Sequence, residues 1–140
     1  NTPGPELAEL PGVHALTDVT GFGLAGHALE IARGAHLTAH IKWADVPVLP
    51  HVSALYKSGH VTGASGRNWD GYGQDISLAA GLPTDCQALL SDPQTSGGLL
   101  VTCSPEAVGD VLAVFKRHGF QDAAVVGHIG EAQTARLVVS

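Results

Sequence analysis

The stretch HALTDVTGFGLAGH, residues 14–27, joins two patterns that together decide the fold. Residues 13–16 form a short apolar run that is typical of a strand, and the polar residues 17–21 follow it as a turn. From residue 22 to residue 35 the apolar side chains recur with the period of a helix. The sequence therefore predicts a strand, a glycine-rich turn and an amphipathic helix in direct succession.

The rest of the chain mixes helices and strands without a strict repeat. Residues 36–41 alternate polar and apolar side chains, which predicts a half-buried strand with His36, Thr38 and His40 on its solvated face. Residues 59–81 are rich in glycine and are expected to form a long irregular loop. Further patterns predict helices at 6–10, 47–56 and 104–118, strands at 98–103, 123–129 and 137–139, and a helix or a strand at 87–90. We expect one α+β domain over residues 1–140, with a mixed β-sheet packed against helices.

Composition excludes several classes of protein. The net charge is −6 and aromatic residues make up 5% of the chain, so the sequence lacks the basic and stacking surface of a nucleic-acid-binding protein. No apolar run is long enough to span a bilayer, and no signal-peptide pattern opens the chain. We therefore expect a soluble cytoplasmic protein with no nucleic-acid or membrane partner. The chain contains no methionine, and we expect it to be part of a longer protein.

Three glycines in the opening stretch match the spacing of dinucleotide-binding folds. Gly21, Gly23 and Gly26 follow a strand and begin a helix, and Asp45 lies about as far along the chain as the ribose-binding carboxylate of that fingerprint. Against this hypothesis, Asp18 lies three residues before the first glycine and would repel a pyrophosphate unless a metal ion lay between them. The dinucleotide hypothesis remains open as an alternative.

Asp18 has two interpretations. It lies on a turn between a strand and a helix, where it could cap the helix or stabilise the turn. Alternatively, it could act beside a helix N-terminus whose backbone N–H groups favour anions. Two further glycine-containing loops, residues 66–73 and 92–98, could likewise be turns or nests of backbone donors for an anion.

Histidine and cysteine give no strong indication of a metal or nucleophilic site. The eight histidines include no HExxH motif, and a strand at 36–41 would place His36 and His40 on a solvated face. Cys86 and Cys103 form no CxxC pair, and Cys103 lies in an apolar run where a buried thiol is the ordinary interpretation. We expect neither cysteine to be a nucleophile.

Three motifs in order resemble selenophosphate synthetases. The opening stretch, residues 14–27, resembles the start of the C-terminal half of that family, and the sequence SDPQTSGGLL, residues 91–100, resembles its late motif. Residues 66–68 with 72–73 are similar to its central loop, and residues 124–130 to its final strand. The resemblance is collinear over essentially the whole chain.

The resemblance implies a fold and a function. It implies the C-terminal α+β domain of a two-domain enzyme related to aminoimidazole ribonucleotide synthetase, in which an absent N-terminal domain holds ATP and forms a homodimer. The family reaction makes selenophosphate from selenide and ATP, with release of AMP and phosphate, and requires Mg²⁺. The family's reactive cysteine or selenocysteine, its essential lysine and its other metal-binding aspartates belong to the N-terminal half. We therefore assign no catalytic residue to this chain and expect it to be inactive alone.

The resemblance carries one residue role over directly, because the aspartate of the TDVTGFG motif corresponds to Asp18 as a magnesium ligand. Mg²⁺ commonly takes one or two carboxylates and fills its other positions with water or phosphate oxygens. A further set of residues is expected close to the ATP phosphates: Thr17, Thr20, Gly21, Gly23, Asn68, Thr95, Ser96 and Gly97. A relative of the same fold that binds another phosphorylated ligand remains the alternative.

Overall fold

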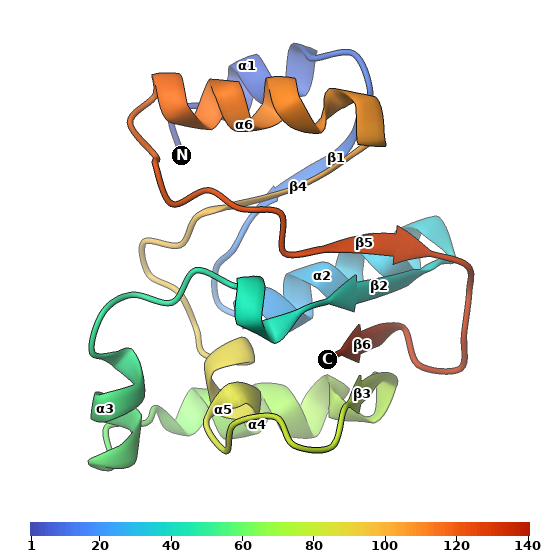
Figure 1. Cartoon of the computed structure of the whole chain (residues 1–140). Coiled ribbons are helices and arrows are strands. Elements are labelled where there is room, and N and C mark those ends of the chain that lie inside the picture. The colour runs from blue at the N-terminus through green and yellow to red at the C-terminus, as the bar shows by residue number, and fades with distance from the viewer.

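The computed structural model describes all 140 residues and contains two β-sheets with helices packed on them (Figure 1). The α-helices are α1 (Gly4–Glu9), α2 (Gly23–Ala35), α3 (Val52–Lys57), α4 (Gly63–Tyr72), α5 (Cys86–Leu90) and α6 (Val108–Arg117). The strands are β1 (Val13–Asp18), β2 (Thr38–Ile41), β3 (Ile76–Leu78), β4 (Leu99–Cys103), β5 (Gly127–Gly130) and β6 (Leu137–Val139). Short 3₁₀ helices cover η1 (Trp43–Asp45), η2 (Gly73–Asp75) and η3 (Pro105–Ala107). The α+β prediction with a mixed sheet is confirmed.

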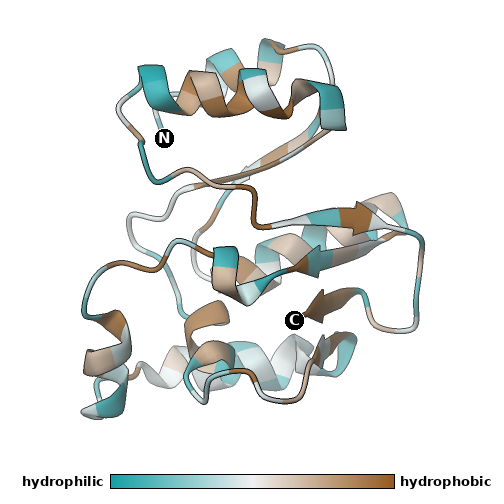
Figure 2. Ribbon diagram, in the orientation of Figure 1, coloured by the Kyte–Doolittle hydropathy of each residue, from teal (hydrophilic) through white to brown (hydrophobic).

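The larger sheet has the order β3-β6-β2-β5. Strand β2 is parallel to β6 on one side and antiparallel to β5 on the other, and β3 is parallel to β6. Strand β2 lies between β6 and β5, and its residues Thr38, Ala39 and Ile41 are buried. Strand β6 is hydrophobic along its length (Figure 2).

The smaller sheet positions the two polar loops that the sequence analysis singled out. Strands β1 and β4 pair antiparallel, with Asp18 opposite Leu99 and Thr17 opposite Leu100. The chain leaves β1 at Asp18 and enters β4 at Leu99, so the segments that follow one strand and precede the other lie at the same end of the sheet. The turn after β1 and the loop before β4 are therefore neighbours.

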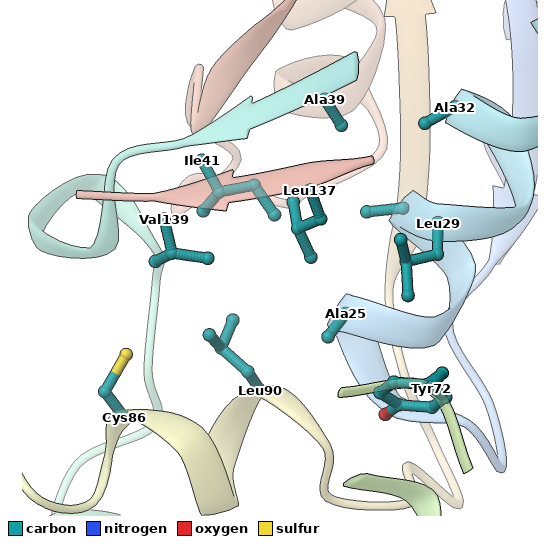
Figure 3. Close-up of a cluster of buried hydrophobic side chains, with 11 residues drawn as sticks. Ala25, Leu29, Ala32, Ala39, Ile41, Tyr72, Cys86, Leu90, Leu137 and Val139 are labelled. Atoms are coloured by element: carbon teal, nitrogen blue, oxygen red, sulfur yellow. The ribbon is translucent and has the colours of Figure 1, made fainter. Parts of the chain in front are cut away.

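Helix α2 forms the main hydrophobic core with the larger sheet. Ala25, Ala28 and Ala32 bring the helix close to the sheet, and Leu29 is fully buried between them. Figure 3 shows Leu29 and Ala25 on one side of this core, facing the strand side chains of Ile41, Leu137 and Val139, with Leu90 of α5 below. Burial of a leucine of this kind contributes about 1.5–3 kcal/mol to stability.

A second, smaller cluster holds α1 and α6 together over the β1–β4 sheet. Its buried members are Leu7 of α1 and Val111 and Val114 of α6. Apolar and polar residues alternate around α6, as an amphipathic helix requires (Figure 2). The protein is thus built around two separate hydrophobic clusters.

The expected irregular loop over residues 59–81 is wrong, because this segment contains α4 and β3. Helix α4 carries glycines that disfavour a helix, so its propensity is poor. Two contacts offset this cost: the Thr62 side chain accepts a hydrogen bond from the backbone N–H of Ser65 at 3.3 Å, and Trp69 and Tyr72 pack on the main core. Tertiary contacts therefore override the local preference.

The predicted solvated face of the strand at 36–41 is also wrong. His36 is not in the strand but ends α2 in the left-handed conformation, with φ of 58°. Thr38 is fully buried, and its hydroxyl donates to the carbonyl of Ala135 at 3.0 Å and accepts from the N–H of Gln133 at 2.8 Å. A hydroxyl whose hydrogen bonds are all made can be buried at little cost. The alternating pattern therefore predicted the wrong environment for Thr38.

The other predicted elements need smaller corrections of their bounds. The helix predicted at 47–56 covers residues 52–57, the strand predicted at 123–129 covers residues 127–130, and residues 104–118 divide into η3 and α6. The segment at 87–90, for which helix and strand were both open, belongs to the helix α5.

Candidate functional site

Three segments that are distant in sequence meet at the end of the β1–β4 sheet: the 17–23 turn, helix α4 and the 91–98 loop. The backbone carbonyl of Thr20 accepts hydrogen bonds from the N–H of Gly23 at 3.1 Å and from that of Gln94 at 2.9 Å. The N–H of Val19 donates to the carbonyl of Gly98 at 2.9 Å. The turn and the 91–98 loop are therefore held as one unit, beside the start of α2 (Figure 1).

Two side chains of helix α4 form hydrogen bonds to this unit on its other side. The Asn68 amide nitrogen donates to the carbonyl of Gly21 at 2.8 Å and to that of Ser91 at 3.0 Å, so it bridges both loops. The Tyr72 hydroxyl donates to the carbonyl of Phe22 at 2.6 Å, and burial raises the pKa of Tyr72 to about 12. These hydrogen bonds fix α4 to the 17–23 turn and to the 91–98 loop.

Two glycines are required because the backbones pass close to each other. Gly23 has a φ of +70°, and a Cβ there would lie 2.6 Å from the carbonyl oxygen of Leu90. A Cβ at Gly97 would collide with the carbonyl oxygen of Val19. Both positions were predicted to lie near phosphate, and the structure gives them a packing reason as well.

Sequence reasoning did not select Asp92 as a site residue, although the structure places it within the same unit. Its carboxylate accepts hydrogen bonds from the Ser65 hydroxyl at 2.9 Å and from the Gln94 side-chain amide at 3.3 Å. These contacts tie α4 to the 91–98 loop. Asp92 thus stabilises the loop that carries Thr95 and Ser96.

Solvent reaches the remaining predicted residues. Asp18, Thr20, Gly21, Thr95 and Ser96 are exposed, and Thr17 is half-buried. No side chain caps the N-terminus of α2, and no acidic residue lies in its first turn. The positive end of the helix dipole therefore meets no negative side chain, although Gly23 is buried there against the backbone of residues 90–92.

The chemistry of these residues fits a magnesium ion only in part. Asp18 offers an exposed carboxylate at the end of β1, and hard oxygen ligands suit Mg²⁺. The chain contains no group of three or more His, Cys, Asp or Glu side chains that could hold a metal together. Asp18 would therefore be one ligand of an ion whose other ligands are waters, phosphate oxygens or residues outside this chain.

A buried histidine, His27, is a further member of the site that sequence reasoning did not select. Its ring lies on the first turns of α2, and its Nε2 is 3.1 Å from the Thr20 hydroxyl oxygen. Its Nδ1 is 2.8 Å from Oε2 of Glu30. The available signal was its spacing: a histidine three residues before a glutamate on a helix can contact that carboxylate.

The two cysteines lie away from this site as free thiols. Burial, with a smaller contribution from the Asp85 carboxylate, raises the pKa of Cys86 to about 11. Burial also raises the pKa of Cys103. Both thiols are therefore protonated at neutral pH, which makes them poor nucleophiles.

The topology rules out the dinucleotide-binding alternative. That fold needs the strand before the glycines to lie in a parallel sheet, joined to its neighbour through the helix. Here β1 lies in a two-stranded antiparallel sheet, and α2 leads to β2 in the other sheet. In addition, a Cβ at Gly26 would meet Phe22 and the Tyr72 ring, so this glycine serves helix packing.

Sequence comparison defines the class of protein. The family described as "AIR synthase related protein, C-terminal domain" matches residues 4–140, and the chain belongs to this family.

No helix in the structure has both the length and the apolar character needed to cross a membrane.

Within this family, the chain is similar to several curated proteins. The chain is 65% identical over 129 residues to the selenide, water dikinase of Burkholderia ambifaria, covering 92% of this chain and 36% of that protein. It is 61% identical over 140 residues to that of Burkholderia pseudomallei, covering all of this chain and 39% of the relative. For the enzyme of Rhizobium meliloti the identity is 48% over 140 residues, again all of this chain and 40% of the relative. The chain thus spans well under half the length of these curated relatives.

Solved structures agree on the fold. E. coli HypE superposes with a TM-score of 0.66 at 23% identity, covering 94% of this chain and 33% of that one. The hydrogenase maturation protein HypE in complex with ATP gives a TM-score of 0.58 at 20% identity, and the match covers 94% of this chain and 33% of that chain. At this identity the likeness establishes the fold alone.

Proposed function

We propose that this chain is the C-terminal domain of a selenide, water dikinase that makes selenophosphate from selenide and ATP and releases AMP and phosphate. One observation carries the proposal. The segments that resemble the family's motifs are joined by hydrogen bonds into one surface, and Asp18 is exposed at the edge of that surface. The relatives at 48–65% identity support it, since their name states this activity.

In this proposal each part of the surface has a role. The exposed Asp18 carboxylate supplies one ligand to Mg²⁺, which would neutralise phosphate charge when bound. The exposed hydroxyls of Thr95 and Ser96 face the phosphates of ATP, and Thr20 lies beside them at the start of α2. The remaining ligands, the nucleophile and the lysine come from the N-terminal domain, which is the expected partner of this surface in a cytoplasmic homodimer.

Asp18→Asn in the longer protein tests the metal role. Asparagine keeps the shape of the side chain but removes its charge, so we expect near-normal folding and a loss of turnover on the order of a hundredfold or more. If Asp18 only stabilised the turn, the variant would instead lose about 1 kcal/mol of stability or less and keep its activity. Melting temperature and selenophosphate formation, measured side by side, separate the two outcomes.

The choice of substrate needs its own test, because a related domain could serve another phosphorylated ligand. We expect AMP release from ATP by the longer protein to depend on selenide. AMP release that is unchanged without selenide would contradict the proposed reaction and favour the alternative.

A further inference from the structure

Thr20, His27 and Glu30 form a continuous row of hydrogen-bonded side chains along the start of α2. The His27 ring is in the middle, with Nε2 3.1 Å from the Thr20 hydroxyl oxygen and Nδ1 2.8 Å from Oε2 of Glu30. His27 is only 6% exposed, whereas the Glu30 side chain is 54% exposed and Thr20 is open to solvent. A buried imidazole therefore connects two exposed groups.

The helix fixes this arrangement. Side chains on a helix point back toward its N-terminus, so His27 reaches the turn that precedes α2, and Glu30 lies one turn further on. The ring of Phe22 lies 6.0 Å from that of His27, centroid to centroid, in a tilted arrangement. The imidazole is thus held in place by its packing as well as by its two hydrogen bonds.

For a neutral His27, the chemistry of the three groups determines the direction of both hydrogen bonds. An ionised carboxylate can only accept a hydrogen bond. Nδ1 of a neutral His27 therefore carries the ring proton and donates a hydrogen bond to Glu30. Nε2 then has only a lone pair, and the Thr20 hydroxyl must donate to it. The hydroxyl proton therefore points inward to His27, and the Thr20 oxygen presents lone pairs to solvent.

We propose that His27 and Glu30 are positioning residues that hold the Thr20 hydroxyl as an acceptor, so that its oxygen faces a cation next to Asp18 and not a phosphate oxygen. The inference rests on the proposed function and assigns Thr20 a more specific part in it. Thr20 follows Asp18, the last residue of β1, by two residues, and both residues are exposed. A lone pair suits a magnesium ion or one of its bound waters, whereas a phosphate oxygen needs a donor.

A role of Thr20 in stabilising the turn does not account for this row. The turn is already fixed by the Thr20 carbonyl, which accepts from the N–H groups of Gly23 and Gln94. The hydroxyl bond to His27 adds a separate constraint, on the direction in which the hydroxyl proton points.

Nitrogen-15 NMR of histidine-labelled chain reads the predicted tautomer directly. We expect His27 in the metal-free chain to be protonated at Nδ1, with Nε2 accepting a hydrogen bond. Thr20→Val should shift the Nε2 resonance while Thr20→Ser leaves it in place, and Glu131→Ala, at an exposed carboxylate distant in sequence, serves as the control. A proton on Nε2 would overturn the inference, because the Thr20 hydroxyl would then be free to donate outward.

Binding of Mn²⁺ to the longer protein, followed by electron paramagnetic resonance of the free ion without nucleotide, tests the consequence. We expect His27→Gln, Glu30→Ala and Thr20→Val each to weaken Mn²⁺ binding, by roughly 10–100-fold for the two positioning residues. Thr20→Ser should keep the affinity. If Asp18→Asn weakens binding but these three variants do not, the inference fails while the proposed function stands. If Asp18→Asn leaves the affinity unchanged, the metal assignment in the proposed function itself is wrong.

Discussion

Gly23, at the start of α2, lies against the backbone of residues 90–92. Its φ is positive, and a Cβ at this position would lie only 2.6 Å from the Leu90 carbonyl oxygen, so both features exclude a side chain. We expect Gly23→Ala to destabilise the chain by about 1–3 kcal/mol or more, since it adds a backbone collision to the cost of the left-handed conformation. Urea unfolding measures this loss.

Gly34→Ala is the matched control for that prediction. Gly34 is also in α2, but its φ is not positive and nothing lies within 4 Å of a Cβ there. Replacing a helical glycine by alanine stabilises by roughly 0.5–1 kcal/mol. Equal effects at the two positions would contradict the close approach at Gly23.

Cys86 should react slowly with thiol reagents while the chain is folded. Burial, with a smaller contribution from Asp85, raises its pKa to about 11, and the residue is 1% exposed. The thiolate that reacts is therefore scarce at pH 7–8. We expect alkylation of Cys86 by iodoacetamide to follow the unfolded fraction in urea, as read by mass spectrometry. Rapid labelling in native buffer would show that the thiol is accessible.

At the scale of the elements, α1 and α6 are joined at their surface by a small charged cluster. Glu6 of α1 accepts hydrogen bonds from His118, at 2.8 Å, and from Arg117 at the end of α6. The hydrogen bond from His118, and then that from Arg117, lowers the pKa of Glu6 below its ordinary value of 4.5. The two helices are therefore held together by charge as well as by their small apolar cluster.

This lowered pKa predicts an acid dependence of stability. Because the carboxyl is more acidic in the folded than in the unfolded chain, its stabilising contribution is present above about pH 4.5 and is lost as the pH falls through the folded pKa. We expect Glu6→Gln to remove this part of the acid dependence, whereas Glu9→Gln, in the same helix, keeps it. The free energy of unfolding measured in urea from pH 3 to pH 7 tests both variants.

Helix α4 illustrates which elements the sequence could predict. Helix α2 and strand β4 have clear patterns, because α2 buries apolar residues at helical spacing and β4 is a nearly continuous apolar run. Helix α4 contains glycines and has little apolar character, and its formation depends on Thr62 at its start and on the packing of Trp69 and Tyr72. Local sequence signals are weak for an element that is stabilised mainly by distant contacts.

At the scale of the whole molecule, the proposed function predicts that this chain alone is inactive. The chain has one exposed candidate ligand in Asp18, protonated cysteines and no cluster of metal-binding side chains. Phosphoryl transfer needs several positioned charges around the phosphates. We expect no AMP from ATP and selenide with the 140-residue chain, and AMP with the longer protein under the same conditions. Turnover by the chain alone would contradict this division of roles.

The sequence by itself determined the fold class, the strand–turn–helix unit at residues 13–35, and the loop at residues 92–98, whereas the loop expected at residues 66–73 is helical. These features depend on local periodicity and on glycine-rich motifs, which are legible along the chain. Only the tertiary structure decided that Asn68 and Tyr72 bind the carbonyls of the 17–23 turn, that Thr38 is buried, and that His27 connects Thr20 to Glu30. A hydrogen bond between distant segments leaves no periodic trace in the sequence, because its partners are chosen by the packing of whole elements and not by their neighbours along the chain.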